Sequence, residues 1–258
     1  MAKVSFNKEK SIGQVVYVVE GDKTEPELIK HIYSVLMDYS VVEYSKKGNK
    51  YEFLQGKNKY SRVFIVPALH SAVKSLLADL SDEYFDEIFK NLSSQYELDV
   101  ENSAVFFLFD RDRKSNRPGR FTYAISKYTC SRGSDDNNEM NGLFLPSYPS
   151  VEAFLLQANG EQPSLSDGKH AKQYVNEKGY VTELLEHGSL ENATFLFLMT
   201  VESIIGEKIK EEDMDNFKDI NMKVFQYEDK KWNEEKVYTT LSMLAASFID
   251  LGIASVEG

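Results

Sequence analysis

The chain has 258 residues, of which 42% are hydrophobic and 12% aromatic, so it is long enough and apolar enough to bury a sizeable core. Its 41 acidic residues outnumber 30 lysines and arginines, and the net charge of −11 excludes a general polycation that coats nucleic acid or an anionic membrane. The single cysteine, Cys130, excludes an internal disulfide and a cysteine-rich zinc site. Because no run approaches the roughly 20 apolar residues of a membrane span, we expect a cytoplasmic protein without membrane contact.

The first predicted elements are a buried strand and a helix. Residues 14–19 form a continuous apolar run, which is typical of a strand covered on both faces in a parallel sheet. Apolar residues recur at helical spacing over 28–36, and Thr24 with Glu27 has the pattern of a capping box, so a helix is predicted to begin near Thr24. Further strands are predicted at 63–66, 103–109 and 143–145, and further helices at 70–80, 84–92 and 151–157.

This alternation of strands and helices predicts an α/β fold with a Rossmann-like parallel sheet. From about residue 160 the strand signals fade, and helical periodicity appears over 174–187, 190–205 and 237–251. We therefore predict an α/β domain over residues 1–160 and a helical C-terminal region over 161–258, packed on or beside the sheet.

Two segments of this acidic chain are basic. Residues 113–132 contain six bases and no acid, and we expect them to lie beside the functional site and set its affinity for phosphates. Residues 46–62 contain six bases against one acid and are interleaved with aromatic side chains. That mixture suits phosphate contact with base stacking, although a solvated loop explains it equally well.

Acidic residues follow two of the predicted strands directly. Glu20 follows the first strand, and Asp110 and Asp112 follow the strand at 103–109. Ligands of parallel sheets bind at the carboxyl ends of the strands, so these acids should meet there. Carboxylates at i and i+2 of an extended segment point to the same side and could share one hard cation such as Mg²⁺. A single strand-end acid could instead cap a neighbouring helix.

These residues resemble a known family. The segment Glu20–Pro26, followed by Asp110 and Asp112, is similar to the Toprim domain of topoisomerases, primases and OLD-type nucleases. It is most similar to the RloB/AbiL branch, whose opening motif reads E-G-x-K-T-E-P. Residues 148–156 resemble the N-P-C-F-E-x-W-L-L segment of that branch in Pro149, Glu152 and the leucine pair, and depart from it elsewhere. The resemblance covers about residues 14–160.

The resemblance implies a Toprim-type fold whose acids hold one or two Mg²⁺ (or Mn²⁺) ions for phosphodiester chemistry. Asp110 and Asp112 would bind the metal, and Glu20 would bind a second metal or act as a general base. Glu152 is a further candidate ligand, or else complements a helix dipole, as we interpret Glu25 to do in the first turn of its helix. The residues that we expect to contact nucleic acid are Lys23, Arg111, Arg113, Lys114 and Lys178.

The sequence thus predicts a metal-dependent nuclease acting on DNA or RNA. Proteins of the similar branch are typically encoded beside an AAA- or ABC-type ATPase in anti-phage defence systems, so the resemblance implies such an ATPase partner, and the chain could act as a homodimer. The alternative is a catalytically weak regulatory or nucleic-acid-binding subunit of an ATPase-containing complex. A phosphoryl-transfer enzyme acting on a small molecule is a third reading of the same acids.

Overall fold

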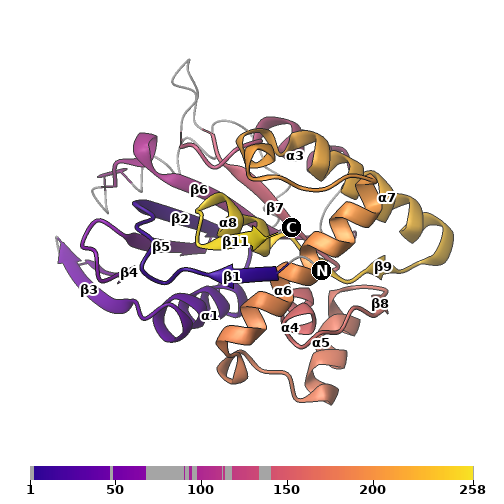
Figure 1. Cartoon of the computed structure of the whole chain (residues 1–258), viewed down its shortest axis with the longest axis horizontal. Helices are drawn as coiled ribbons and strands as arrows, with labels where there is room; N and C mark the ends of the chain where they lie inside the picture. The colour runs from indigo at the N-terminus through magenta and orange to yellow at the C-terminus, as the bar shows by residue number, and fades with distance from the viewer. Residues whose placement is uncertain are drawn as a thin grey trace.

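Figure 1 shows the computed structural model of the chain. It describes residues 3–46, 49–67, 90, 93–94, 98–111, 113, 118–133 and 141–257. The helix predicted at 70–80 and nearly all of the one predicted at 84–92 lie outside these residues, as do Asp112 and Lys114. Within the described residues, no helix is long and apolar enough to cross a membrane.

The described strands are β1 (Lys3–Phe6), β2 (Gln14–Val19), β3 (Ser40–Lys46), β4 (Asn49–Gln55), β5 (Arg62–Pro67), β6 (Ala104–Asp110), β7 (Leu143–Tyr148), β8 (Ser164–Leu165), β9 (Tyr238–Thr239), β10 (Leu241–Ser242) and β11 (Ala254–Glu257). The described α-helices are α1 (Thr24–His31), α3 (Pro118–Lys127), α4 (Glu152–Ala158), α5 (Gly168–Lys178), α6 (His187–Ile205), α7 (Lys218–Glu235) and α8 (Leu244–Asp250).

A seven-stranded mixed sheet in the order β10-β7-β6-β2-β5-β4-β3 organises the fold. Its four central strands, β7, β6, β2 and β5, are parallel, and the outer strands β10, β4 and β3 are antiparallel to their neighbours. The chain is therefore an α/β protein of Rossmann-like class, as predicted. The strands predicted at 14–19, 63–66, 103–109 and 143–145 correspond to β2, β5, β6 and β7.

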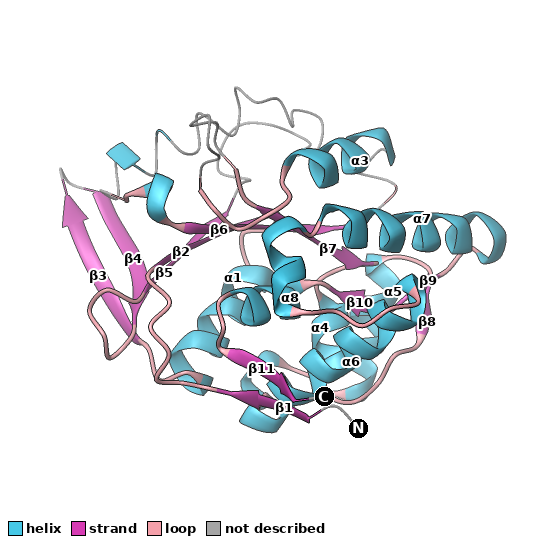
Figure 2. Cartoon of the chain, turned by 45° about the horizontal axis from the view of Figure 1, so that its top comes forward, coloured by secondary structure: helices cyan, strands magenta, loops and turns pink. Residues whose placement is uncertain are grey.

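Helices cover both faces of the sheet, which explains why its central strands are apolar without alternation. Val15, Tyr17 and Val19 of β2 face a core that includes α1, α4, α6 and α8. Val16 and Val18 face the opposite core, to which α3 and Phe225 of α7 contribute. Figure 2 shows α3 and α7 on one side of the sheet and α1, α4 and α6 on the other.

The C-terminal region is less purely helical than predicted, and it shares its core with the sheet. Strand β10 joins the central sheet beside β7, and β11 pairs with β1, which brings the chain termini together (Figure 1). Strands β8, β9 and β10 have two residues each, too few to produce a periodic sequence signal. The helix at 190–205 agrees with α6, whereas α3 and α7 were not predicted.

Two local predictions need correction. The predicted capping box is wrong. The N-cap residue of α1 is Lys23, with Thr24 as the first residue of the helix, and the Lys23 side chain makes no cap hydrogen bond. The segment 46–62 is not a loop, because it contains β4 and the first residue of β5. Within it, the Phe53 ring stacks on Phe64 and carries the Arg62 guanidinium at 5.5 Å, so this ring packs within the protein.

Candidate functional site

Glu20 and Asp110 meet at the carboxyl ends of β2 and β6. These strands are parallel neighbours in which Val19 pairs with Leu108, so the residues that follow them come together. The backbone N–H of Glu20 donates to the Leu108 carbonyl at 3.1 Å. The N–H of Asp110 donates to Oε2 of Glu20 at 2.8 Å. Strand pairing therefore produces the adjacency that the sequence predicts for these two acids.

The segment after β7 brings a third acid to the same edge. Strand β7 lies beside β6, with Ser147 opposite Asp110. The N–H of Val151 donates to Oδ1 of Asp110 at 2.8 Å. The Ser150 hydroxyl donates to Oε2 of Glu152 at 2.7 Å, and Glu152 is buried at the start of α4. The motif at 148–156 therefore lies at the same sheet edge as Glu20 and Asp110.

Glu25 is a fourth acid, which sequence reasoning placed outside the site. Its side chain is 5% exposed and accepts a hydrogen bond from the Gly21 N–H at 3.2 Å. A Cβ atom at position 21 would lie 2.5 Å from Oε2 of Glu25, so any larger residue there would have to displace the Glu25 carboxylate. The first-turn position of Glu25 had a sufficient structural explanation in the sequence, and only its burial reveals that it belongs with the other acids.

The four acids, Glu20, Glu25, Asp110 and Glu152, form what we call the acid cluster. Removal from water raises the pKa of Asp110 well above its usual range, and the charges of Glu20, Glu25 and Glu152 raise it further. Burial also raises the pKa of Glu25, to which Glu152 and Asp22 add. The cluster therefore favours a neutralising proton or a bound cation.

The donor atoms suit a hard divalent cation, which prefers carboxylate oxygens. Their arrangement is incomplete, however, since no three acidic, histidine or cysteine side chains among the described residues are placed to hold a metal ion. Glu20, Asp110 and Glu152 each direct one oxygen to a protein donor. The expected metal ligand Asp112 lies outside the described residues.

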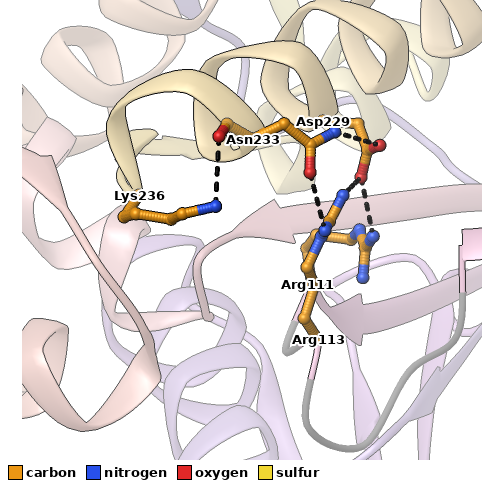
Figure 3. Close-up of polar contacts among 5 residues, drawn as sticks. All are labelled: Arg111, Arg113, Asp229, Asn233 and Lys236. Carbon is orange, nitrogen blue, oxygen red and sulfur yellow. Dashed lines mark hydrogen bonds and ion pairs between the residues drawn. The ribbon is translucent and has the colours of Figure 1, made fainter.

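Arg111 lies on the other side of the sheet from the acids and is completely buried. Its Nη2 forms an ion pair with Oδ1 of Asp229 at 3.1 Å (Figure 3). Its guanidinium lies 5.0 Å from the Phe121 ring centroid and 5.2 Å from that of Phe225. A guanidinium without surface exposure cannot reach a nucleic-acid backbone, so we reassign Arg111 to holding α7 against the sheet.

Arg113 shares the partner of Arg111 but remains partly exposed. It pairs with Asp229, donates to Oδ1 of Asn233 at 3.0 Å, and stacks on Trp232 at 4.4 Å. Asp229 is 118 residues from Arg111 in the sequence, and no local pattern marks it as the partner. Figure 3 shows both arginines reaching toward α7 from the end of β6.

The other expected nucleic-acid contacts are dispersed. Lys23 is exposed and lines a cavity with Lys30 and Glu52, between the start of α1 and strands β4 and β5. Lys178 pairs with Glu161 at 3.0 Å. The start of α5 is near the acids, because a Cβ atom added to Gly168 would lie 3.3 Å from Ser150. Lys178 is the last residue of the same helix, about 15 Å further along its axis.

The basic segment 113–132 does not lie together beside the acids, which corrects the prediction. Arg132 pairs with Ala104 at the first residue of β6, whereas Asp110 is the last residue of that strand. Six residues of strand separate these ends by roughly 20 Å. Helix α3, which the sequence did not reveal, carries the chain from one end of the strand to the other.

Comparisons of the chain with protein-family models, with curated proteins and with solved structures found no match. The acid cluster and the motif resemblance are therefore the grounds for a functional proposal.

Proposed function

We propose that the chain is a metal-dependent nuclease of Toprim type, which hydrolyses phosphodiester bonds with Mg²⁺ or Mn²⁺. One observation carries the proposal: Glu20, Glu25, Asp110 and Glu152 gather at the carboxyl ends of the parallel strands, where burial and then the charges of the other three acids raise the pKa of Asp110. Such a gathering costs stability, and a divalent cation would relieve it. Motif resemblance over residues 14–160 supports the Toprim assignment.

In this proposal Asp110 and Glu20, together with Asp112, would hold the ion. The metal would supply charge neutralisation of the scissile phosphate and a water of lowered pKa. The chain itself fixes the acids: the Asp110 N–H orients Glu20, and the Val151 N–H orients Asp110. Glu25 and Glu152 add negative charge that strengthens the attraction for a cation. We propose an ATPase partner and a role in anti-phage defence on the resemblance alone.

A second candidate, the catalytically weak regulatory subunit, also has an observation in its favour. Glu20, Asp110 and Glu152 each accept a hydrogen bond from a protein group through one carboxylate oxygen. Among the described residues, no three side chains are placed to hold a metal ion. In that case the cluster would be held neutral by protons, and the sheet edge would serve binding.

Metal-dependent melting separates the two candidates. Millimolar Mn²⁺ should raise the melting temperature of the wild type and leave that of Asp110→Asn unchanged. Asp219→Asn, the same change at an exposed position in the first turn of α7, should respond like wild type. Cleavage assays on single- and double-stranded DNA and on structured RNA should be run alongside, with and without a candidate ATPase partner. A wild type that shows no melting shift with Mn²⁺ would overturn the nuclease proposal in favour of the regulatory subunit.

A further inference from the structure

A cavity of about 320 Å³ lies between the end of β6 and the end of α7. Arg113, Trp232, Lys236 and Tyr238 contribute to its wall, together with Asp167. Two residues of its wall are close neighbours, in the chain, of residues that lead to the acid cluster. Arg111, which also lines it, directly follows Asp110 in the chain. Gly168, next to Asp167, packs close to Ser150, whose hydroxyl binds Glu152. The wall of the cavity is therefore connected to the acid cluster through two short stretches of chain.

Two cations are ordered on one indole ring at this cavity. The Arg113 guanidinium carbon lies 4.4 Å and the Lys236 ammonium 4.6 Å from the Trp232 ring centroid. Such cation–π contacts hold both charges in place before a ligand arrives. Figure 3 shows Lys236 at the end of α7, pointing back along the helix toward Asn233.

These cations keep donor capacity for an anion. The exposed Lys236 ammonium gives one hydrogen bond, to the Asn233 carbonyl at 3.1 Å, and an ammonium carries three donors. Arg113 directs one donor of each Nη group to Asp229 or Asn233, and its Nε is buried. A guanidinium carries five N–H donors, so a second donor on each Nη is left for a ligand. The acid in the wall, Asp167, already caps α5 by accepting from the His170 N–H at 2.9 Å.

We propose that this cavity binds a phosphate of a nucleic-acid strand, with Arg113 and Lys236 as its ligands and Trp232 as the platform that positions them. The inference rests on the proposed function for its polymeric substrate. Acids that attract a metal ion also repel the phosphates of a nucleic-acid strand. A nuclease of this kind therefore needs positively charged side chains nearby, and Arg113 and Lys236 would provide them. Arg113 is three positions after Asp110, so their Cα atoms are at most about 11 Å apart, a distance that a few nucleotides of strand would cover.

The chain carries its own probe, because Trp232 is the only tryptophan. The experiment titrates the full-length chain with a single-stranded oligonucleotide in EDTA and follows tryptophan fluorescence. We expect a saturable change in emission. Lys236→Gln should weaken the apparent affinity about tenfold, as for a lost charge-assisted hydrogen bond. It should also reduce the slope of log affinity against log salt by about 0.7, the value for one phosphate contact on a single strand.

Lys223→Gln is the matched control, because it removes the same charge from the same helix. Lys223 pairs with Glu207 at 2.8 Å and lies about 20 Å along α7 from Lys236, so its substitution should leave the titration unchanged. Lys236 is exposed, and melting curves should show that both variants fold. Absence of an emission change in the wild type, or equal affinities of the two variants, would overturn the inference.

Inorganic pyrophosphate in a parallel titration distinguishes the source of the phosphate. A response to pyrophosphate with none to the oligonucleotide would overturn the assignment to a strand. Since EDTA removes divalent metals, the outcome is independent of the metal site. Oligonucleotide binding without any Mn²⁺ melting shift would retain this cavity and reject the nuclease. A melting shift with Mn²⁺ but no fluorescence response to the oligonucleotide would retain the nuclease proposal and reject the phosphate-binding cavity.

Discussion

Asp110 and Arg111 are consecutive residues of opposite charge that lie in opposite kinds of surroundings. Asp110 meets Glu20, Glu25 and Glu152, whose charges add to its own. Arg111 meets Asp229 and two aromatic rings. A buried cation with a carboxylate partner and ring contacts has a structural explanation. Neighbouring carboxylates have the opposite effect on one another, because the charge of each opposes the ionisation of the next. The proposed metal site would account for the acids, whereas the surroundings of Arg111 need no ligand.

The alternation of a strand produces this contrast. Along β6, Phe106 and Leu108 face the core of α1 and α4, while Phe107 and Phe109 face the core of α3 and Phe225. Continuing the alternation turns Asp110 toward the first face and Arg111 toward the second. One strand end thus supplies an acid to the candidate site and an anchor for α7.

The largest expected effect is that of Asp110→Asn, which should abolish metal-dependent cleavage while raising stability. Losing a metal ligand removes several kcal/mol of transition-state stabilisation, a decrease of about 1000-fold in rate. Asparagine keeps an oxygen for the Val151 N–H and removes the charge that the other acids repel. Paired cleavage assays and melting curves at pH 7 test this. A variant that is both inactive and strongly destabilised would indicate a structural aspartate.

The pH dependence sharpens that prediction. The folded-state pKa of Asp110 is raised, so ionisation of this carboxyl destabilises the fold as pH rises above about 4, its unfolded value. The advantage of Asp110→Asn in melting temperature should therefore be present at pH 7 in the absence of metal and shrink as the pH falls toward 4. An advantage that is constant with pH would contradict the electrostatic origin.

On the opposite side of the sheet, Asp229→Asn should have the opposite effect on stability. Asp229 neutralises the completely buried Arg111 and also pairs with Arg113. Breaking a buried pair by removing one partner costs about 3 kcal/mol. Denaturant unfolding should show this loss, whereas Asp219→Asn on the same helix should change stability little. A loss below about 1 kcal/mol would mean that the aromatic rings, and not the ion pair, hold Arg111.

The sequence predicts what depends on neighbours in the chain and on strand order. The apolar runs before Glu20 and Asp110 identify β2 and β6, and parallel pairing then brings the two acids together. The partnership of Arg111 with Asp229 spans 118 residues and has no local signature. The prediction that the basic segment 113–132 lies beside the acids was wrong for a related reason. Net charge along the chain does not reveal that α3 carries Arg132 to the far end of β6.

Glu228 is a third kind of buried ionisable group, which forms no ion pair with any residue that the structure describes and is not part of the acid cluster. It is completely buried on α7, and burial raises its pKa to about 7 although the Thr239 N–H donates to it at 2.8 Å. Stability contributed by the neutral form is therefore complete below about pH 4.5 and lost as the pH rises through 7. Glu228→Gln should be more stable than wild type at pH 8, by at most about 3 kcal/mol, and equal to it at pH 4.5. Unfolding in denaturant at the two pH values measures this, and a difference that does not depend on pH would show that the pKa of Glu228 is the same in the folded and unfolded states.

The smallest effect is expected from Lys178→Gln, which compares an exposed ion pair with the buried one. Lys178 pairs with Glu161 at the surface, and Glu161 also accepts hydrogen bonds from Tyr174 and Tyr180. The pair gains little in water and is screened by salt, so the melting temperature should stay within experimental error of wild type. The substitution should also leave oligonucleotide affinity unchanged, because Lys178 lies at the end of α5 away from Ser150. Lys236→Gln removes the same charge at the cavity and should weaken binding. If Lys178→Gln weakened oligonucleotide binding as much as Lys236→Gln, the strand would run over α5, and the original sequence-based assignment of Lys178 would be correct.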